Sequence, residues 1–429
     1  MTSHMRQSIV EACSGRFFYG WVIVSVGSFG VFSSGPGQSH TFSVFLEPIG
    51  TELGISSATL ATAYGLATLA AAFMLPQMGR LIDRWGPRKG LLAIVLALGA
   101  ACFFFGAAAN FLWLAVGFAL MRFFGQGSLM MGCANLVSQW FTLNRGLAMS
   151  LMALGFGASM AVHPPLSQYL VNEIGWRNAW YAMGLITWIT MLPPLLLLVF
   201  DKPEDVSLRP DGQAPVEGAA KGATDPEISG LSLREALRTS TFYILSAVWF
   251  AIAMLVTTLH FYQVTVVTDQ GLSKQAAASL FTISALTMVC MMPVVGRMFD
   301  RLRTRYVLAL GLVVTALNLA GITFVSSFTT GVIYALMFGL NNALSMTMFG
   351  YIWPRYFGRK HLGSIQGTGQ MVGVFGASLG PLPVGLAYDL VGNATLTLQA
   401  LAIFPAVLAV LALLFLRAPA SLTESAHLE

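Results

Sequence analysis

Charge is scarce in this sequence. Asp, Glu, Lys and Arg make up only 10% of the 429 residues, while 56% are hydrophobic. Soluble globular proteins carry about 25% charged residues, so the composition argues against an ordinary water-soluble fold. Runs of about 20 apolar residues cross a bilayer as helices. The sequence contains twelve such runs, at 18–46, 58–79, 90–109, 112–139, 146–171, 177–200, 242–267, 275–298, 306–327, 330–353, 362–390 and 395–417. We therefore expect an all-α membrane protein with twelve transmembrane helices.

The signatures of catalysis and of metal or cofactor binding are missing. The four cysteines, Cys13, Cys102, Cys133 and Cys290, lie far apart and suggest neither a disulfide framework nor a metal site. The sequence has no His-Glu metal motif, no Gly-x-Ser-x-Gly nucleophile elbow and no phosphate-cradling loop beside a strand. We expect no enzyme activity, no cofactor and no metal. The net charge of +5 indicates membrane orientation and not binding to nucleic acid.

Acidic residues are also absent from the middle of the predicted spans. Glu47, Asp269 and Asp389 lie near span ends, and Asp83 and Asp300 fall in loops. A proton relay built on carboxylates is therefore poorly supported. Histidine titrates near neutral pH, so histidines within the spans remain the candidates for proton binding.

The basic residues that are present are distributed unevenly. Of the 23 Lys and Arg residues, 20 fall in loops on one side if the N-terminus is cytoplasmic. Positive residues stay on the cytoplasmic side during insertion, so both termini are expected to be inside. The first apolar run is too long for the short hydrophobic region of a cleavable signal. We expect a multi-pass protein of a bacterial-type inner membrane.

The chain divides into two similar halves. Residues 201–240 are rich in Pro, Gly, Asp and Glu and predict a cytoplasmic linker between bundles at 1–200 and 241–429. "GRLIDR" at 79–84 recurs as "GRMFDR" at 296–301, and "FGAS" at 156–159 recurs at 375–378. Paired bundles of this kind are typical of secondary transporters, which bind their substrate near the midplane.

The loop "GRLIDRWGPRKG" at 79–90 predicts a conformational contact. Gly79 would allow two helices to approach closely, and the carboxylate of Asp83 can face a helix N-terminus or pair with an arginine. The alternative is a basic loop that only fixes topology. The recurrence in the second half favours a gating role, for which the candidate residues are Gly79, Asp83, Arg84, Asp300 and Arg301.

This Gly-x-x-x-Asp-Arg-x-Gly-x-Arg loop resembles the signature loop of the major facilitator superfamily. The closer resemblance is to monocarboxylate transporters and oxalate/formate antiporters. The stretches that carry it are "YGWVIV" (19–24), "TFSVFLEPI" (41–49), "WFTLNRGLAMSLMALGFG" (140–157) and "GWRNAWYAMG" (175–184). The resemblance implies two six-helix bundles related by pseudo-twofold symmetry, which alternate access to a central site.

The stretch "GPGQSHTFSVF" at 35–45 places polar groups inside the first span. In the related families the first helix is broken here and lines the cavity, and a lysine before the "TFSVF"-like segment handles substrate and proton. His40 takes that place. His260 occupies the matching position of span seven, 220 residues later. Both are candidates for substrate binding and proton coupling, and the alternative for each is an inert, hydrogen-bonded histidine. His163, before Pro164-Pro165, favours a helix bend.

Other polar residues within the spans complete the candidate site. Arg122 is the only basic residue well inside a span, and a charge there should face the bundle interior. It either binds an anion or donates to backbone carbonyls. The remaining substrate-binding candidates are Gln38, Tyr64, Asn341, Asn342, Gln370 and Met292. Amides in spans also bond across helices, so a packing role stays open for each.

The resemblance fails in span eight. The related families have an arginine directly before a proline there, which grips the substrate carboxylate, whereas this chain has Met292 before Pro293. Either His40, His260 or Arg122 supplies the positive charge instead, or a cationic residue placed elsewhere does, or the substrate is neutral, zwitterionic or apolar. We expect a proton-coupled transporter of a small, monocarboxylate-like organic acid that works as a monomer in the lipid bilayer. The alternative is an exporter of a bulkier apolar or neutral metabolite or drug, which Met288 and Met292 would suit.

Overall fold

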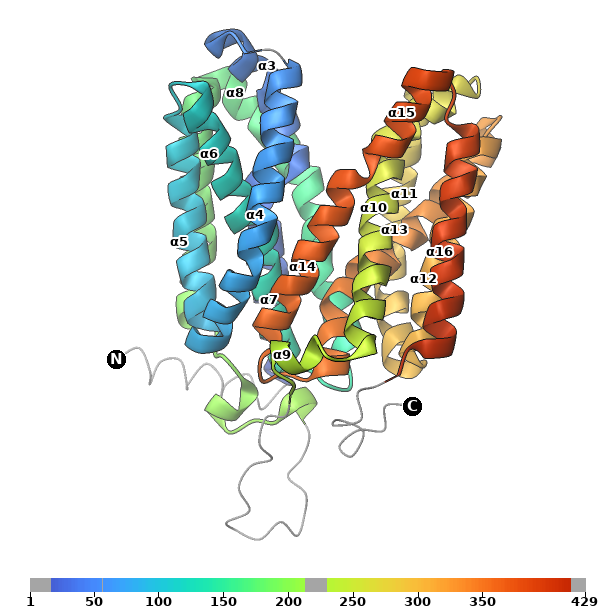
Figure 1. Ribbon diagram of the computed structural model, residues 1–429. Coiled ribbons are helices and arrows are strands. Elements are labelled where there is room, and N and C mark those ends of the chain that lie inside the picture. The colour runs from blue at the N-terminus through green and yellow to red at the C-terminus, as the bar shows by residue number, and fades with distance from the viewer. Residues whose placement is uncertain (1–16, 56, 213–229, 418–429) are drawn as a thin grey trace. The chain divides into compact units, whose positions relative to one another are not determined.

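A computed structural model describes residues 17–55, 57–212 and 230–417, and every regular element in these ranges is a helix. The elements are α2 (Gly20–Ser33), η1 (Gly35–Gly37), α3 (Ser39–Leu53), α4 (Ser57–Trp85), α5 (Pro87–Gly106), α6 (Phe111–Met121), η2 (Arg122–Leu129), α7 (Met130–Trp140), α8 (Arg145–Leu197), η3 (Pro203–Val206), η4 (Pro210–Gly212), α9 (Leu233–Ala236), α10 (Ser240–Asp269), α11 (Lys274–Arg301), α12 (Thr304–Gly321), η5 (Ile322–Phe324), α13 (Phe328–Phe357), α14 (Leu362–Leu379), α15 (Pro381–Val391) and α16 (Thr395–Phe415) (Figure 1). Both chain termini and residues 213–229 of the predicted linker lie outside the described ranges.

The twelve predicted spans all fall on helices. Ten helices in the described part of the chain are long and apolar enough to cross a membrane. One of them, α8, contains two predicted spans joined at Gly175, where the backbone is non-helical with a φ of 75°. The first predicted span is the broken segment α2–η1–α3. The expected all-helical class is confirmed.

Contacts divide the chain into two compact units. The first contains residues 1–230 together with 358–370, and the second contains 231–357 together with 371–429. Residues 358–370, which include the first half of α14, therefore group with the N-terminal helices although they lie late in the sequence.

The first unit is built around α8 and a cluster of rings. The two parts of α8 pack against α2, α3 and α5. Phe42, Phe105, Phe118 and Trp180 lie with ring centroids 4.8–5.7 Å apart. Trp180 is fully buried and so are Phe105 and Phe118. Offset and edge-to-face ring packing of this kind stabilises a core beyond simple burial, and here it holds α3, the second part of the broken first helix.

The second unit packs its helices in pairs. The most extensive contacts join α11 to α13 and α12 to α16. The hydroxyl of Ser284 on α11 donates to the carbonyl of Ala335 on α13 at 2.9 Å. Small residues and hydroxyls at such crossings let helices approach closely in a membrane, where packing replaces the hydrophobic effect as the force between them.

Candidate functional site: a broken helix and a buried arginine

The first helix is broken over the sequence Gly35-Pro36-Gly37. Side chains of the same segment form hydrogen bonds at the break. Thr41 Oγ1 donates to the carbonyl of Gly35 at 2.6 Å, and Gln38 Nε2 donates to Ser34 Oγ at 2.9 Å. Gln38, predicted to bind substrate, is itself buried, and it supports the break.

Close backbone packing holds the break in place. A Cβ at Gly37 would lie 2.6 Å from the Cα of Gly125 on η2, and a Cβ at Gly125 would meet Gly37 in the same way. Only glycine fits such an approach. The facing segment η2 is a π-helix, a feature found mostly as short insertions in α-helices and frequently at functional sites.

Arg122 begins this π-helical segment and reaches into the break. Its side chain is buried, with 6% exposed. Nη1 donates to the carbonyl of Gly37 at 3.0 Å and to Ser39 Oγ at 3.3 Å, and Nε donates to Thr68 Oγ1 at 3.1 Å. The guanidinium carbon lies 4.9 Å from the centre of the Tyr64 ring. Every one of these partners is neutral. The hydrogen bond from Arg122 to a backbone carbonyl, which the sequence offers as the alternative to anion binding, is present. It is one of four contacts of the guanidinium.

Ser39 and Tyr64 connect the arginine to the start of α3. Their hydroxyl oxygens are 2.8 Å apart. We call Gly37, Ser39, Tyr64, Thr68 and Arg122 the Arg122 cluster. In the described ranges no carboxylate forms an ion pair with Arg122, since the two ion pairs found there are Glu52–Arg177 and Glu204–Arg359. The first turn of α3 also has no acidic residue and no side-chain cap at Gln38.

His40 follows Ser39 directly and contacts α8. Its Nε2 lies 3.2 Å from Ser159 Oγ, which lies 3.1 Å from Nδ1 of His163. The structure thus connects His40, through Ser159, to His163, for which the sequence favours a helix bend. Ser159 was missed as a site residue, although it belongs to the recurring "FGAS" segment.

The predicted site residues of the second unit have packing contacts of their own. Asn341 is fully buried, and its Oδ1 accepts a hydrogen bond from Thr315 Oγ1 at 2.8 Å. Asn342 is 7% exposed and Met292 is fully buried. His260 is exposed, with Nδ1 2.9 Å from the carbonyl of Val256.

Gln370 belongs to the first unit, at the end of its segment of α14. The side chain is buried, and its Oε1 accepts no hydrogen bond from a described residue.

Asp83 caps the N-terminus of α14. Its carboxylate accepts hydrogen bonds from the backbone N–H of Gly363 at 2.7 Å and of Ser364 at 2.8 Å, and also from Ser364 Oγ. Gly79 and Gly363 touch through their backbones, so that a Cβ on either would collide with the carbonyl of the other. A carboxylate at this end of a helix is favoured by the helix dipole. Of the other predicted gating residues, Arg84 and Arg301 are exposed at the ends of α4 and α11, and Asp300 is half-buried beside Arg301.

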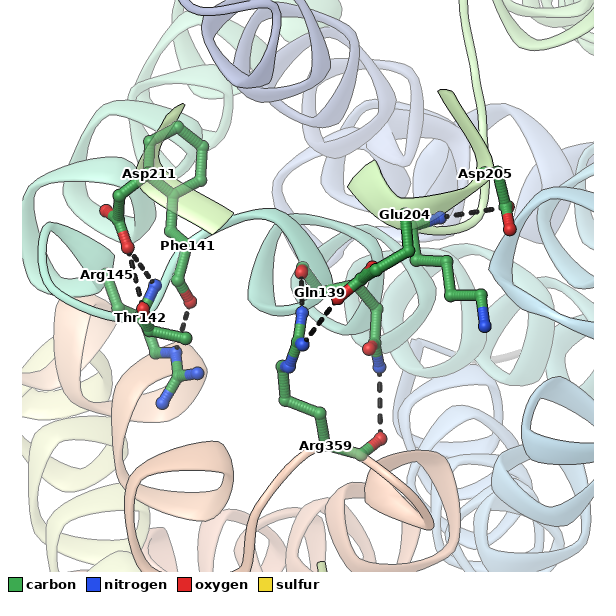
Figure 2. Close-up of polar contacts among 9 residues, drawn as sticks. Gln139, Phe141, Thr142, Arg145, Glu204, Asp205, Asp211 and Arg359 are labelled. Atoms are coloured by element: carbon green, nitrogen blue, oxygen red, sulfur yellow. Dashed lines mark hydrogen bonds and ion pairs between the residues drawn. The ribbon is translucent and has the colours of Figure 1, made fainter. Parts of the chain in front are cut away.

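The linker contributes an ion pair that the sequence did not predict (Figure 2). Glu204 Oε1 on η3 lies 3.0 Å from Nη2 of Arg359. Arg359 also donates through Nη1 to the carbonyl of Gln139, and Gln139 Nε2 donates back to the carbonyl of Arg359 at 3.1 Å. These contacts tie the linker and the end of α7 to the segment that precedes α14.

A second linker carboxylate holds the loop before α8 (Figure 2). Asp211 accepts hydrogen bonds from the backbone N–H groups of Thr142, Leu143 and Asn144 at 2.7–2.9 Å. Burial opposes ionisation of Asp211, but the hydrogen bonds from Leu143, Asn144 and Thr142 together outweigh burial, and the pKa of its carboxyl is lowered. Asp211 itself has a positive φ of 58°, a strained conformation that these contacts hold.

Comparison with known proteins agrees with this architecture. The sequence profile of the Major Facilitator Superfamily matches residues 27–266 and 261–427. The oxalate:formate antiporter of Oxalobacter formigenes is 28% identical over 50% of this chain and 48% of its own length. Human monocarboxylate transporter 11 is 28% identical over 39% of this chain and 36% of its own length. The match thus covers half or less of each of these two relatives.

A solved structure shows the same fold over most of the chain. The human organic anion transporter MFSD10 (TETRAN) superposes with a TM-score of 0.67 at 14% identity, over 93% of this chain and 99% of that one. The signature loop, the described helices and the match to the family profile along both halves lead to one conclusion. The chain belongs to the major facilitator superfamily, and it is a multi-pass membrane transporter and not an enzyme.

Proposed function

We propose that this transporter moves a small organic acid, a monocarboxylate or a close analogue, across the cell membrane together with protons. The observation that carries the proposal is the buried guanidinium of Arg122, whose described partners are all neutral. A buried charge is costly to leave without a counter-charge. An anionic substrate would supply that charge, because arginine matches a carboxylate in both sign and geometry.

The position of the arginine supports the same proposal. Arg122 contacts Gly37 and Ser39, which flank the N-terminus of α3. The N-termini of broken half-helices direct backbone N–H groups and a partial positive charge at anionic substrate groups in other transporters. Nε and Nη1 have described acceptors, while Nη2 makes no hydrogen bond to a described residue. Nη2 is therefore the donor that remains for a substrate carboxylate.

Arg122 also accounts for the missing arginine of span eight. Met292, which stands in that place, is fully buried on α11 and cannot supply charge. In this proposal Arg122 on η2 of the first unit supplies the positive charge that the arginine of span eight supplies in the related families. Tyr64, Gln38 and Ser39 would shape the site around it, with Gln370 as a further candidate of the same unit. Asn341, Asn342 and His260 of the second unit stay candidates for substrate binding. His40 and His260 would bind the coupled proton.

Gating is assigned to the cytoplasmic ends of the helices. The Asp83 cap on α14 and the crossing of Gly79 with Gly363 would hold one state of the transport cycle, and Arg84, Asp300 and Arg301 would act at the ends of α4 and α11. The ion pair of Glu204 with Arg359, which lies in the segment that precedes α14, would form in the same state of the cycle. Both termini would be cytoplasmic, and the monomer would be the working unit.

Export of a bulkier apolar or neutral compound remains the alternative. It was suggested by Met288 and Met292, which are 6% and 0% exposed. Neither methionine adds an observation in favour of that substrate class.

The test is uptake of radiolabelled organic anions into proteoliposomes. A panel of lactate, pyruvate, formate, oxalate and benzoate is offered with and without an inward proton gradient. We expect at least one anion to accumulate only with the gradient, and Arg122→Gln to abolish its accumulation. Arg238→Gln removes an exposed arginine and serves as the control. Equal uptake by Arg122→Gln and Arg238→Gln would contradict the proposal.

A further inference from the structure

Two histidines of the first unit are bridged by one serine hydroxyl. His40 Nε2 lies 3.2 Å from Ser159 Oγ, and Ser159 Oγ lies 3.1 Å from His163 Nδ1. The ring centroids of the two histidines are 6.5 Å apart, too far for a direct hydrogen bond. Ser159 is fully buried and His163 is 5% exposed, whereas His40 is half-buried. The hydroxyl is therefore the connection between a partly accessible imidazole and a buried one.

The position of His163 is fixed by its neighbours. A Cβ at Gly35 would fall on the His163 ring, and the ring of Phe32 lies 4.8 Å away, centre to centre. The ring thus packs directly on the broken helix. Nδ1 of His163 has a second partner in the carbonyl oxygen of Ser159, at 3.2 Å. A protonated Nδ1 can donate to this carbonyl, and an unprotonated Nδ1 can accept from the hydroxyl.

Among the described residues, charged, titratable and aromatic groups lie near this chain of residues. Arg122 on η2 and Tyr64 on α4 approach through Ser39, the neighbour of His40. Two aromatic rings also contact the pair. Phe156 of α8 lies 5.8 Å from His40, and Phe32 of α2 covers His163. The charges of His163 and Arg122 both act on a proton at His40.

We propose that His40, Ser159 and His163 form a proton relay in which His163 holds the coupled proton away from the anion. The step is a transfer of one proton. In the imidazolium form of His40, Nε2–H donates its proton to Ser159 Oγ, and the Ser159 hydroxyl passes its own proton to the unprotonated Nδ1 of His163, which becomes the imidazolium. One N–H bond breaks, one N–H bond forms, and the hydroxyl is regenerated. This proposal rests on the proposed proton-coupled function and adds Ser159 and His163 to it.

The relay can be tested without any substrate. Full-length protein is labelled with ¹⁵N-histidine, placed in lipid nanodiscs, and its imidazole nitrogen signals are followed against pH. His40→Gln and His163→Gln assign the two signals. We expect His40 and His163 to change together in two steps, because sites that interact by more than about one pH unit titrate as a pair. In His163→Gln, His40 should titrate in one step, at a pH displaced by roughly one unit.

Ser159→Ala is the decisive variant. It removes the hydroxyl that both rings contact and should narrow the separation between the two titration steps, while Ser159→Thr keeps a hydroxyl and should leave that separation as in wild type. Ser150→Ala is the matched control, since Ser150 is a buried serine of the same helix whose hydroxyl donates to the carbonyl of Leu147 at 2.8 Å. An equal melting temperature for Ser159→Ala and Ser150→Ala establishes that the fold is intact. If Ser159→Ala does not fold, His163→Gln and Ser159→Thr carry the test.

Two results would overturn the relay. In the first, Ser159→Ala leaves the titration curves of His40 and His163 as in wild type. In the second, His163→Gln does not shift the pH of the His40 transition. A failure of the proposed transport function is distinct from both. Coupled titration without flux of any organic acid would reject the anion and leave the proton site in place.

Discussion

Arg122 donates a hydrogen bond to the carbonyl oxygen of Gly37 at 3.0 Å, so that a cationic side chain of η2 binds the backbone at the break in the first helix. The same guanidinium contacts Ser39 and Thr68 and lies on the ring of Tyr64. The break and the arginine are thus parts of one structure. Substitutions that change the packing of the break should affect the position of the cation as well as stability.

Gly37→Ala should destabilise the protein and weaken anion transport together. The added Cβ would lie 2.6 Å from the Cα of Gly125, and overpacking of this kind costs about 1–3 kcal/mol. The measurement is the melting temperature in detergent, followed by uptake in proteoliposomes. Gly65→Ala is the control, because a Cβ at Gly65 on α4 has no atom within 4 Å. Equal melting temperatures for the two variants would contradict the close backbone contact between Gly37 and Gly125.

The ion pair of Glu204 with Arg359 should be stronger than that of Glu52 with Arg177. The side chains of the first pair are 22% and 13% exposed, whereas those of the second are 48% and 32% exposed. Exposed pairs contribute about 0–1 kcal/mol because solvent screens them. Double-mutant cycles with the four Gln substitutions measure both coupling energies. We expect the larger coupling for Glu204–Arg359, and a larger value for Glu52–Arg177 would contradict this order.

Asp211→Asn should reduce stability near pH 7 and have little effect in acid. The folded-state pKa of Asp211 is lowered, so its contribution is present above the unfolded value of about 3.9 and is lost as pH falls through the lower folded value. The melting temperatures of wild type and variant, measured from pH 7 downward, should therefore converge below about pH 4.

Asp205→Asn should change the pH dependence of stability in the opposite direction. Burial, followed by the nearby Asp201 carboxylate, raises the pKa of Asp205. Its contribution is therefore present at low pH and is lost as pH rises through the folded value. The melting temperature of wild type relative to this variant should fall as pH rises. Parallel pH curves for Asp211→Asn and Asp205→Asn would contradict both assignments.

The sequence predicted those features that depend on local composition. Apolar runs located all twelve spans, because a bilayer imposes length and low charge on every crossing helix. Gly35-Pro36-Gly37 predicted the break, because proline removes a helix hydrogen bond. Arg122 was singled out because a charge inside a span needs a specific environment.

Contacts between distant segments were beyond the reach of the sequence. Ser159 resembles any small residue in a span, and only the packing of α3 on α8 brings it to His40. Glu204 and Asp211 lie in a stretch whose composition indicates a solvated linker, yet they bind Arg359 and the loop before α8. Neither partner is marked by sequence spacing, since the residues of each pair lie 155 and 69 positions apart.

The most direct measurement is anion binding to purified wild type, Arg122→Gln, Arg122→Lys and Arg238→Gln by thermal shift. An anion at 100 times its dissociation constant stabilises the native state by about 2.7 kcal/mol. We expect an organic anion to raise the melting temperature of wild type and Arg238→Gln, to do so less for Arg122→Lys, which keeps charge but loses the planar fork, and to leave Arg122→Gln unchanged. An equal shift in Arg122→Gln and wild type would contradict the assignment of Arg122 as the anion site.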